Sequence, residues 1–181
     1  MYRLREIKKE DLKAINQWRN DPELISCLGA PFRYINLEVD FKWFENYMSN
    51  RNNCIRCAIV DEDYVEDILG LVSLTGIDYI HRCAALHIMI GNESCRGKGI
   101  GTFAVNAMLE HGFLNMNLHR IELGVLKNNK VAIGLYEKCG FVKEGAKRKA
   151  VYKNGSYQDL IMMAILDTDY NKAHKNKGEI M

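Results

Sequence analysis

The sequence has no excess of charge of one sign and no long apolar run. Its 181 residues carry 25 Lys and Arg against 23 Asp and Glu, which is too balanced for a domain that grips nucleic acid mainly by charge. Apolar runs such as Ile161 to Leu166 are far shorter than the ~20 residues that cross a bilayer. Residues 1–6 lack the apolar stretch of a signal peptide. We therefore expect a cytoplasmic protein that binds neither nucleic acid nor membrane.

The cysteine pattern favours reduced thiols over a disulfide framework or a zinc site. Without a secretory signal, reduced and mostly buried thiols are expected in a chain of this length. Cys54-x-x-Cys57 also fits a redox motif or half of a zinc site. No second Cys pair or His pair follows at finger spacing, and the two residues lie in a strand-like run. We therefore expect strand cysteines and no metal site.

Hydrophobic periodicity predicts one α+β domain over residues 1–170, followed by a frayed polar tail over 171–181. We find no internal repeat or interdomain linker. Helices are expected after Asp11, stopping at Asp21-Pro22, and after Asn36. Ile100, Phe103, Ala107 and Leu114 are expected to form the apolar stripe of a longer helix. The remaining expected elements are strands at 1–7, 55–60, 68–77, 84–90 and 120–126, helices at 99–116 and 130–139, and a hairpin at Asn154-Gly155.

The most informative segment joins a predicted strand to the longest predicted helix. It contains Gly97, Gly99 and Gly101 together with Arg96 and Lys98. A helix N-terminus presents free N–H groups and a positive dipole end, and glycines let the backbone approach a phosphate closely. Three glycines spaced by two at a helix start are costly to folding without such a reason. The segment therefore predicts an anion site.

Two common phosphate-binding motifs fit this segment less well. Gly99-x-Gly101-x-x-Ala104 matches the dinucleotide fingerprint, and Glu122 on the next strand resembles its ribose-binding acid. That fingerprint follows its strand through a tight turn, whereas residues 91–98 intervene here, and repeated βαβ units are missing. A Gly-Lys-Ser/Thr sequence at Walker A spacing is also missing. We therefore expect the protein to bind neither a dinucleotide nor ATP.

Two separated motifs resemble those of the GNAT superfamily of acetyltransferases. Arg96-x-x-Gly99-x-Gly101 is similar to its acetyl-CoA pyrophosphate loop. Asn129-x-x-Ala132 and Leu135-Tyr136-Glu137-Lys138-x-Gly140-Phe141 resemble its second cofactor segment. Trp18-Arg19-Asn20-Asp21-Pro22, Glu144-Gly145 and Gln158-Asp159 are similar to its RimJ/RimL-type branch. The resemblance implies a mixed, mostly antiparallel central sheet flanked by helices, and transfer of an acetyl group from acetyl-CoA to an amine.

The resemblance also implies where acetyl-CoA binds. Backbone groups of Ile88, Met89 and Ile90 would pair with the amides of the pantetheine arm, and the Asn129 side chain would contact that arm. The pyrophosphate would lie on the N–H groups of the glycine-rich loop, which comprises Arg96, Gly97, Lys98, Gly99, Ile100 and Gly101.

Direct transfer requires a neutral amine and a protonated or stabilised thiolate leaving group. Tyr136 matches the superfamily's general acid at the thiol; otherwise it is a core tyrosine. Glu122 is the first candidate base, because it lies on the opposite strand face from Ile121 and Leu123. Glu93 and a chain of water molecules are the alternatives. His87, which alternates with Leu86 and Ile88, would line the cleft or be a structural strand histidine.

The sequence leaves the amine acceptor open. A protein N-terminus, as in ribosomal-protein acetyltransferases, a polyamine such as spermidine or spermine, and a nucleotide amino-sugar all fit the resemblance. Trp18, Arg19 and Phe32 lie where the superfamily's acceptor-lid helices sit, and Arg19 would suit an acidic acceptor. The acidic turn at 61–67 would suit a polycation, although a solvated turn is the simpler interpretation. A CoA-binding module without turnover and a homo-oligomer also stay open.

Overall fold

One mixed sheet of seven strands forms the centre of the protein, and its strands follow the order β1-β2-β3-β4-β5-β7-β6. The structure is a computed structural model and describes residues 1–91, 95 and 97–178. Only the pairing of β4 with β5 is parallel, so the expected mostly antiparallel sheet is confirmed. The strands are β1 (Tyr2–Glu6), β2 (Cys54–Asp61), β3 (Tyr64–Asp78), β4 (Cys83–Ile90), β5 (Arg120–Leu126), β6 (Val142–Lys153) and β7 (Ser156–Leu166).

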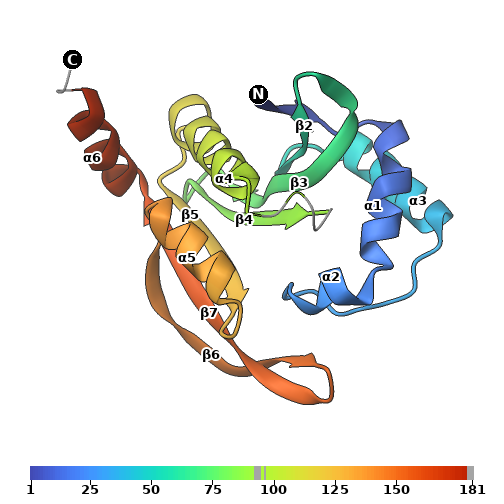
Figure 1. Ribbon diagram of the computed structural model, residues 1–181. Helices are drawn as coiled ribbons and strands as arrows, with labels where there is room; N and C mark the ends of the chain where they lie inside the picture. The colour runs from blue at the N-terminus through green and yellow to red at the C-terminus, as the bar shows by residue number, and fades with distance from the viewer. Residues whose placement is uncertain (92–94, 96, 179–181) are drawn as a thin grey trace.

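Helices cover both faces of this sheet. Figure 1 shows α1 and α3 beside β2 and β3, while α4 and α5 lie over the middle of the sheet. Within the described residues, no helix is long and apolar enough to cross a membrane. The helices are α1 (Leu12–Arg19), α2 (Pro22–Ser26), α3 (Leu37–Ser49), α4 (Ile100–Glu110), α5 (Lys130–Lys138) and α6 (Asp167–Gly178), with a 3₁₀ turn η1 (Lys9–Asp11) and a π turn η3 (His111–Asn115).

Strand alternation divides the apolar residues between two cores. Successive strand residues point to opposite faces, so Ile59, Val72 and Leu86 pack with α4 and α5 on one face. Ala58 and Val60 point the other way and pack with residues of α1 and α3. We call these the α4 face and the α1 face of the sheet.

The apolar stripe of α4 differs from the predicted one. The buried residues of the helix include Ile100, Ala104 and Met108, which recur every four positions. The π turn η3 follows directly and holds five residues in a wider loop of backbone. This turn changes the helical phase, so Phe113 is buried while Leu114, predicted to face the core, is 60% exposed.

The N-terminal region also departs from prediction in its caps. The carboxylate of Asp11 does not cap α1; it forms an ion pair with Arg5 at 2.8 Å and accepts the Lys8 N–H at 2.7 Å. The helix ends near Asp21-Pro22 as predicted. However, Asp21 then caps a short unpredicted helix, α2, by accepting the N–H groups of its first turn.

The predicted frayed tail is wrong over most of its length. The backbone is helical from Asp167 to Gly178, so α6 begins before residue 170 and runs through the expected boundary. Asp167 and Asp169 lie in its first turn, where carboxylates favour the helix dipole. The Tyr170 ring packs 5.1 Å from that of Phe113 and anchors the helix to the α4-face core.

The hairpin at Asn154-Gly155 is confirmed. Both residues have positive φ angles, +48° and +78°, as a two-residue turn of this kind requires. The turn joins β6 to β7 with Lys153 opposite Ser156. It therefore extends a two-stranded arm from the end of the sheet (Figure 1).

Candidate active site

Strands β4 and β5 separate after a short paired stretch. They pair over three positions, from Cys83 with Arg120 to Ala85 with Glu122, and no further pair joins these fully described strands. The later part of β4 pairs with β3 on one side, so the backbone groups of Ile88 to Ile90 on its other side face the gap. The resemblance to the GNAT superfamily implies that the pantetheine arm, an extended chain with amide groups, pairs with these residues.

The start of α4 lies where the sequence predicts an anion site. Gly99 is the N-cap residue with a φ of +81°, and Gly97 has a φ of +75°. The first intrahelical hydrogen bond runs from the Phe103 N–H to the Gly99 carbonyl at 2.9 Å. The N–H groups of Ile100 and Gly101 precede it and are available to an anion. A Cβ at residue 97 or 99 would meet no described atom within 4 Å, so this backbone borders open space.

Gly101 and Lys98 have different roles in that loop. A Cβ on Gly101 would stand 2.7 Å from Leu135 Cδ1, so this glycine allows α5 to pack closely against α4. Lys98 is exposed and adds a positive charge at the helix start. Arg96, predicted to bind the pyrophosphate, and Glu93, an alternative base, lie outside the described residues.

Helices α1 and α2 bridge the open end of the gap between β4 and β5. On the β4 side, the Trp18 ring occupies the space where a side chain on Gly91 would stand. On the β5 side, the Asn129 amide donates a hydrogen bond of 3.0 Å to the Cys27 carbonyl. The Asn129 side-chain oxygen accepts the Ala132 N–H and caps α5. Asn129, predicted to contact the pantetheine arm, therefore already holds two protein groups together.

The β6–β7 hairpin contacts α2 and the segment that follows it. The ammonium group of Lys153 donates to the Ile25 carbonyl at 2.6 Å and also to the Ala30 carbonyl. The lysine is 5% exposed, and burial lowers the pKa of its ammonium group. The hairpin, α2 and the start of α5 thus close one side of the gap.

Tyr136 lies on α5, with its ring in the α4-face core. The residue is 9% exposed, and its ring meets that of Phe141 edge to face at 5.8 Å. Burial raises the pKa of Tyr136 to about 12, with a smaller contribution from the nearby Cys139. Among the described residues, the hydroxyl has no hydrogen-bond partner. The phenol is therefore protonated at neutral pH, and its hydroxyl forms no hydrogen bond with another described residue.

Glu122 lies beside the point where β4 and β5 separate. Its carboxylate accepts two hydrogen bonds from Arg120, at 3.0 and 3.2 Å. The same guanidinium holds Glu144 through two bonds of 2.6 Å and lowers the pKa of that carboxyl. The carboxylate of Glu122, the predicted base, is therefore already engaged in an ion pair.

His87 lies on the same face of the sheet as Glu122. It follows Ala85 on the same face of β4, and its Nε2 lies 2.9 Å from Thr75 Oγ1. Partial desolvation, and then the positive charge of Arg56, lower the pKa of His87. The imidazole is therefore mostly neutral at pH 7 and can accept a proton. Its alternation with Leu86 and Ile88 was the available sequence signal.

The other predicted acceptor residues have structural partners. Arg19 forms an ion pair with Asp40, a fully buried carboxylate, and so joins α1 to α3. In the acidic turn at 61–67, Glu66 pairs with Lys8 and Asp61 with the N-terminal ammonium. Phe32 packs against Tyr34 at 5.2 Å.

Cys54 and Cys57 are strand residues, as the sequence predicts. They lie three positions apart on β2, so their side chains point to opposite faces of the sheet, and both are free thiols. Among the described residues, no group of three His, Cys, Asp or Glu is arranged to hold a metal ion.

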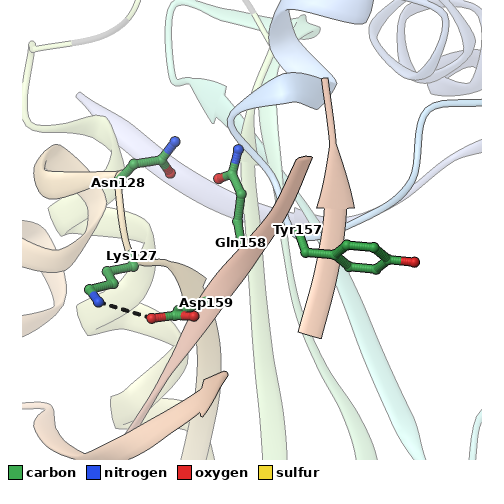
Figure 2. Close-up of a pocket in the computed structure, with 5 residues that line it drawn as sticks. All are labelled: Lys127, Asn128, Tyr157, Gln158 and Asp159. Carbon is green, nitrogen blue, oxygen red and sulfur yellow. Dashed lines mark hydrogen bonds and ion pairs between the residues drawn. The ribbon is translucent and has the colours of Figure 1, made fainter. Parts of the chain in front are cut away.

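A shallow hollow of about 330 Å³ lies beside the bridge, between the loop after β5 and the start of β7. Figure 2 shows Asn128 and Gln158 extending their amides to the same side, while the Tyr157 ring points away from them. Lys127 and Asp159 form an ion pair of 2.9 Å at its floor. This hollow presents amides rather than free charge.

Comparison with known proteins identifies the class of this site. The family model of the acetyltransferase (GNAT) domain matches residues 2–142, and the chain belongs to that family. It is an acetyl-CoA-dependent N-acetyltransferase, which transfers an acetyl group to an amine.

The relatives of this chain include enzymes whose names specify a polyamine. A spermidine N(1)-acetyltransferase of Vibrio cholerae is 35% identical over 168 residues, covering 92% of this chain and 94% of the relative. One from Escherichia coli K12 is 30% identical and covers 99% of this chain and 93% of the relative. The crystal structure of the Vibrio cholerae spermidine N-acetyltransferase in complex with CoA and spermine superposes with a TM-score of 0.87 at 32% identity, covering 94% of this chain and 98% of that one.

Proposed function

We propose that the acceptor is a primary amine on a small molecule, and that spermidine and spermine are its reference acceptors. The proposal rests on the contacts of Asn129 and Lys153 with α2, which bridge the gap between β4 and β5. Because Lys153 and Asn129 tie the hairpin and α5 to α2, the approach to the point of strand separation is restricted on that side. A slender amine fits such an approach better than the N-terminus of a folded protein.

The names of the relatives support polyamines within this class. Their similarity extends over nearly the whole chain, including the bridge and the hairpin. Nothing in the described site pairs with a polycation in an obvious way, since Glu122, Glu144 and Asp159 are all held by cations of the protein. The support for spermidine comes from the relatives, and they make it the acceptor to test first.

The proposed binding of acetyl-CoA uses main-chain groups. The N–H groups at the start of α4 would hold the pyrophosphate, and the free side of β4 from Ile88 to Ile90 would pair with the pantetheine arm. These residues fit the ligand because the loop borders open space and the strand edge is unpaired. The bound thioester supplies the acetyl group.

Two side chains have proposed roles in proton transfer. His87 accepts a proton from the acceptor ammonium, which makes the nitrogen nucleophilic. Tyr136 donates its phenol proton to the departing thiolate. Glu122 stays as the alternative base, although its ion pair with Arg120 opposes that role.

A thiol-release assay tests the proposal. Purified enzyme with acetyl-CoA is offered spermidine, spermine, a monoamine and a short peptide with a free N-terminus, and CoA release is followed. We expect the small amines to exceed the peptide by at least about tenfold in kcat/KM. Faster turnover of the peptide would overturn the proposal. Tight acetyl-CoA binding without turnover of any amine would instead favour a CoA-binding module.

A further inference from the structure

A second hollow, of about 340 Å³, lies on the α1 face of the sheet. Its walls come from α3, the start of β2 and the end of β3. Trp43, Tyr47 and Arg56 form one side, and Asn46, Asn50 and Asn53 supply amides around it. Nothing in the acetyl-CoA site described above uses this hollow.

Arg56 is a cation without an acidic partner. Among the described residues, no carboxylate forms an ion pair with it, and its buried Nε has no hydrogen-bond partner. Buried polar atoms are nearly always paired, so this Nε is a donor that the described fold leaves unused. The nearby acid Glu6 is already engaged, because it accepts the Tyr47 hydroxyl at 2.6 Å and pairs with Arg51 at 2.5 Å.

Two aromatic rings hold the Arg56 guanidinium in place. It lies 5.0 Å from the centre of the Trp43 ring and 5.7 Å from that of Tyr47. Such stacking orients the guanidinium while leaving its hydrogen-bond donors free for a planar or tetrahedral anion. Arg56 is therefore prepared to bind a carboxylate or a phosphate.

The strand register connects Arg56 to the reaction site. Arg56 pairs across the sheet with Ser73, and Ser73 pairs with His87, so the three lie in one row on the α1 face. Two strand spacings place the Arg56 and His87 backbones ~10 Å apart. The hollow also includes Thr75, whose hydroxyl contacts the His87 ring.

We propose that the Arg56 hollow binds an acidic group, a carboxylate or a phosphate, at the far end of the amine acceptor. This inference rests on the proposed function and narrows its substrate class. Because Thr75 lines the hollow and its hydroxyl contacts the His87 ring, an amine presented to His87 with an acidic group several bonds away would pass Thr75 and reach Arg56. Spermidine has no acidic group, so it serves as the reference acceptor against which the effect of an acidic group is measured.

The test compares acceptors that differ in one acidic group. ω-Amino acids of increasing length are measured against the alkylamines of the same length and against spermidine. We expect wild-type enzyme to prefer the ω-amino acid of the best length by roughly tenfold or more in kcat/KM, the scale of a charge-assisted hydrogen bond. Arg56→Met should abolish this preference and leave the alkylamine rate within about threefold. Arg148→Met, which removes an exposed arginine on β6, is the matched control and should keep the preference.

A binding measurement separates this inference from the proposed function. Inorganic phosphate is titrated into CoA-saturated protein, in which the α4 site is filled, and binding should be lost in Arg56→Met but not in Arg148→Met. Absence of Arg56-dependent phosphate binding overturns the inference, as does an acid preference that survives Arg56→Met. Phosphate binding through Arg56 with no gain in turnover for acidic amines overturns its assignment to the acceptor. Failure of every amine overturns the proposed function instead.

Discussion

The Tyr136 hydroxyl offers the sharpest test of the proposed chemistry. Tyr136→Phe removes one oxygen and keeps the ring that packs against Phe141. Because no described residue hydrogen-bonds this hydroxyl, its removal breaks no bond within the fold. The free energy of unfolding should therefore change by about 0.5 kcal/mol or less. Any large loss of activity then reflects chemistry rather than folding.

The expected loss of activity follows from the role of a general acid. Removing such a group usually lowers kcat by ~10²-fold or more, and a thiolate leaving group favours the lower end of that range. A factor of ~10² corresponds to ~2.7 kcal/mol of transition-state stabilisation. Acetyl-CoA affinity should stay within a few-fold, since the pyrophosphate and the pantetheine arm are held by other groups.

The pH profile gives an independent check on Tyr136. An ordinary phenol titrates near pH ~10, but burial raises the pKa of Tyr136 to about 12. The acid stays protonated as pH rises through that interval, so its loss should not limit activity below about pH 11. Tyr79→Phe, which removes an exposed hydroxyl bonded to the Asn52 carbonyl at 2.9 Å, is the control and should leave kcat unchanged. A near-normal kcat for Tyr136→Phe on the best acceptor would reduce Tyr136 to core packing.

Four further variants test other parts of the site. Gly99→Glu should weaken acetyl-CoA binding at least ~10-fold by calorimetry while the protein stays folded. Gly101→Glu should instead lower the Tm, because a Cβ at this position meets Leu135. Equal Tm values for the two variants would contradict this difference. Lys153→Met frees two carbonyls and should cost about 1–3 kcal/mol in denaturant unfolding, with a higher KM for the amine and unchanged acetyl-CoA affinity. His87 gains a proton as pH falls through its lowered pKa, so kcat/KM should decrease below pH 6.5. His87→Gln should remove this decrease of kcat/KM at acid pH for the same amine. If the decrease is unchanged in the variant, His87 is excluded as the base.

Much of the fold follows from local patterns in the sequence. Alternation located β4 and β5, Asn154-Gly155 located the hairpin, and the glycine-rich loop located the start of α4. These signals are local, since each depends on side-chain period or on backbone conformation at one or two residues. The π turn that rotates Leu114 outward depends on packing, which no local pattern encodes.

The two halves of the site differ in how far the sequence reveals them. Acetyl-CoA is expected to bind to backbone groups, and the glycines that expose those groups are visible as a motif. Glu122 was chosen as base from its strand face alone. Its neutralisation by Arg120, which also holds Glu144 from another strand, depends on a long-range pairing that the motif does not contain.

The acceptor side is harder still to predict because its side chains come from separate elements. Arg56 is on β2, Trp43 on α3 and His87 on β4, and sheet register alone brings them into one region. The sequence suggested Arg19 as the cation for an acidic acceptor, but Arg19 instead forms an ion pair with Asp40. In the described structure, the neighbouring arginine Arg51 has an acidic partner and Arg56 has none. Arg56 is therefore the cation of this region that is available to an acidic group. Acceptor preference in this enzyme is expected to follow that unpaired charge, while the main-chain site for acetyl-CoA is independent of it.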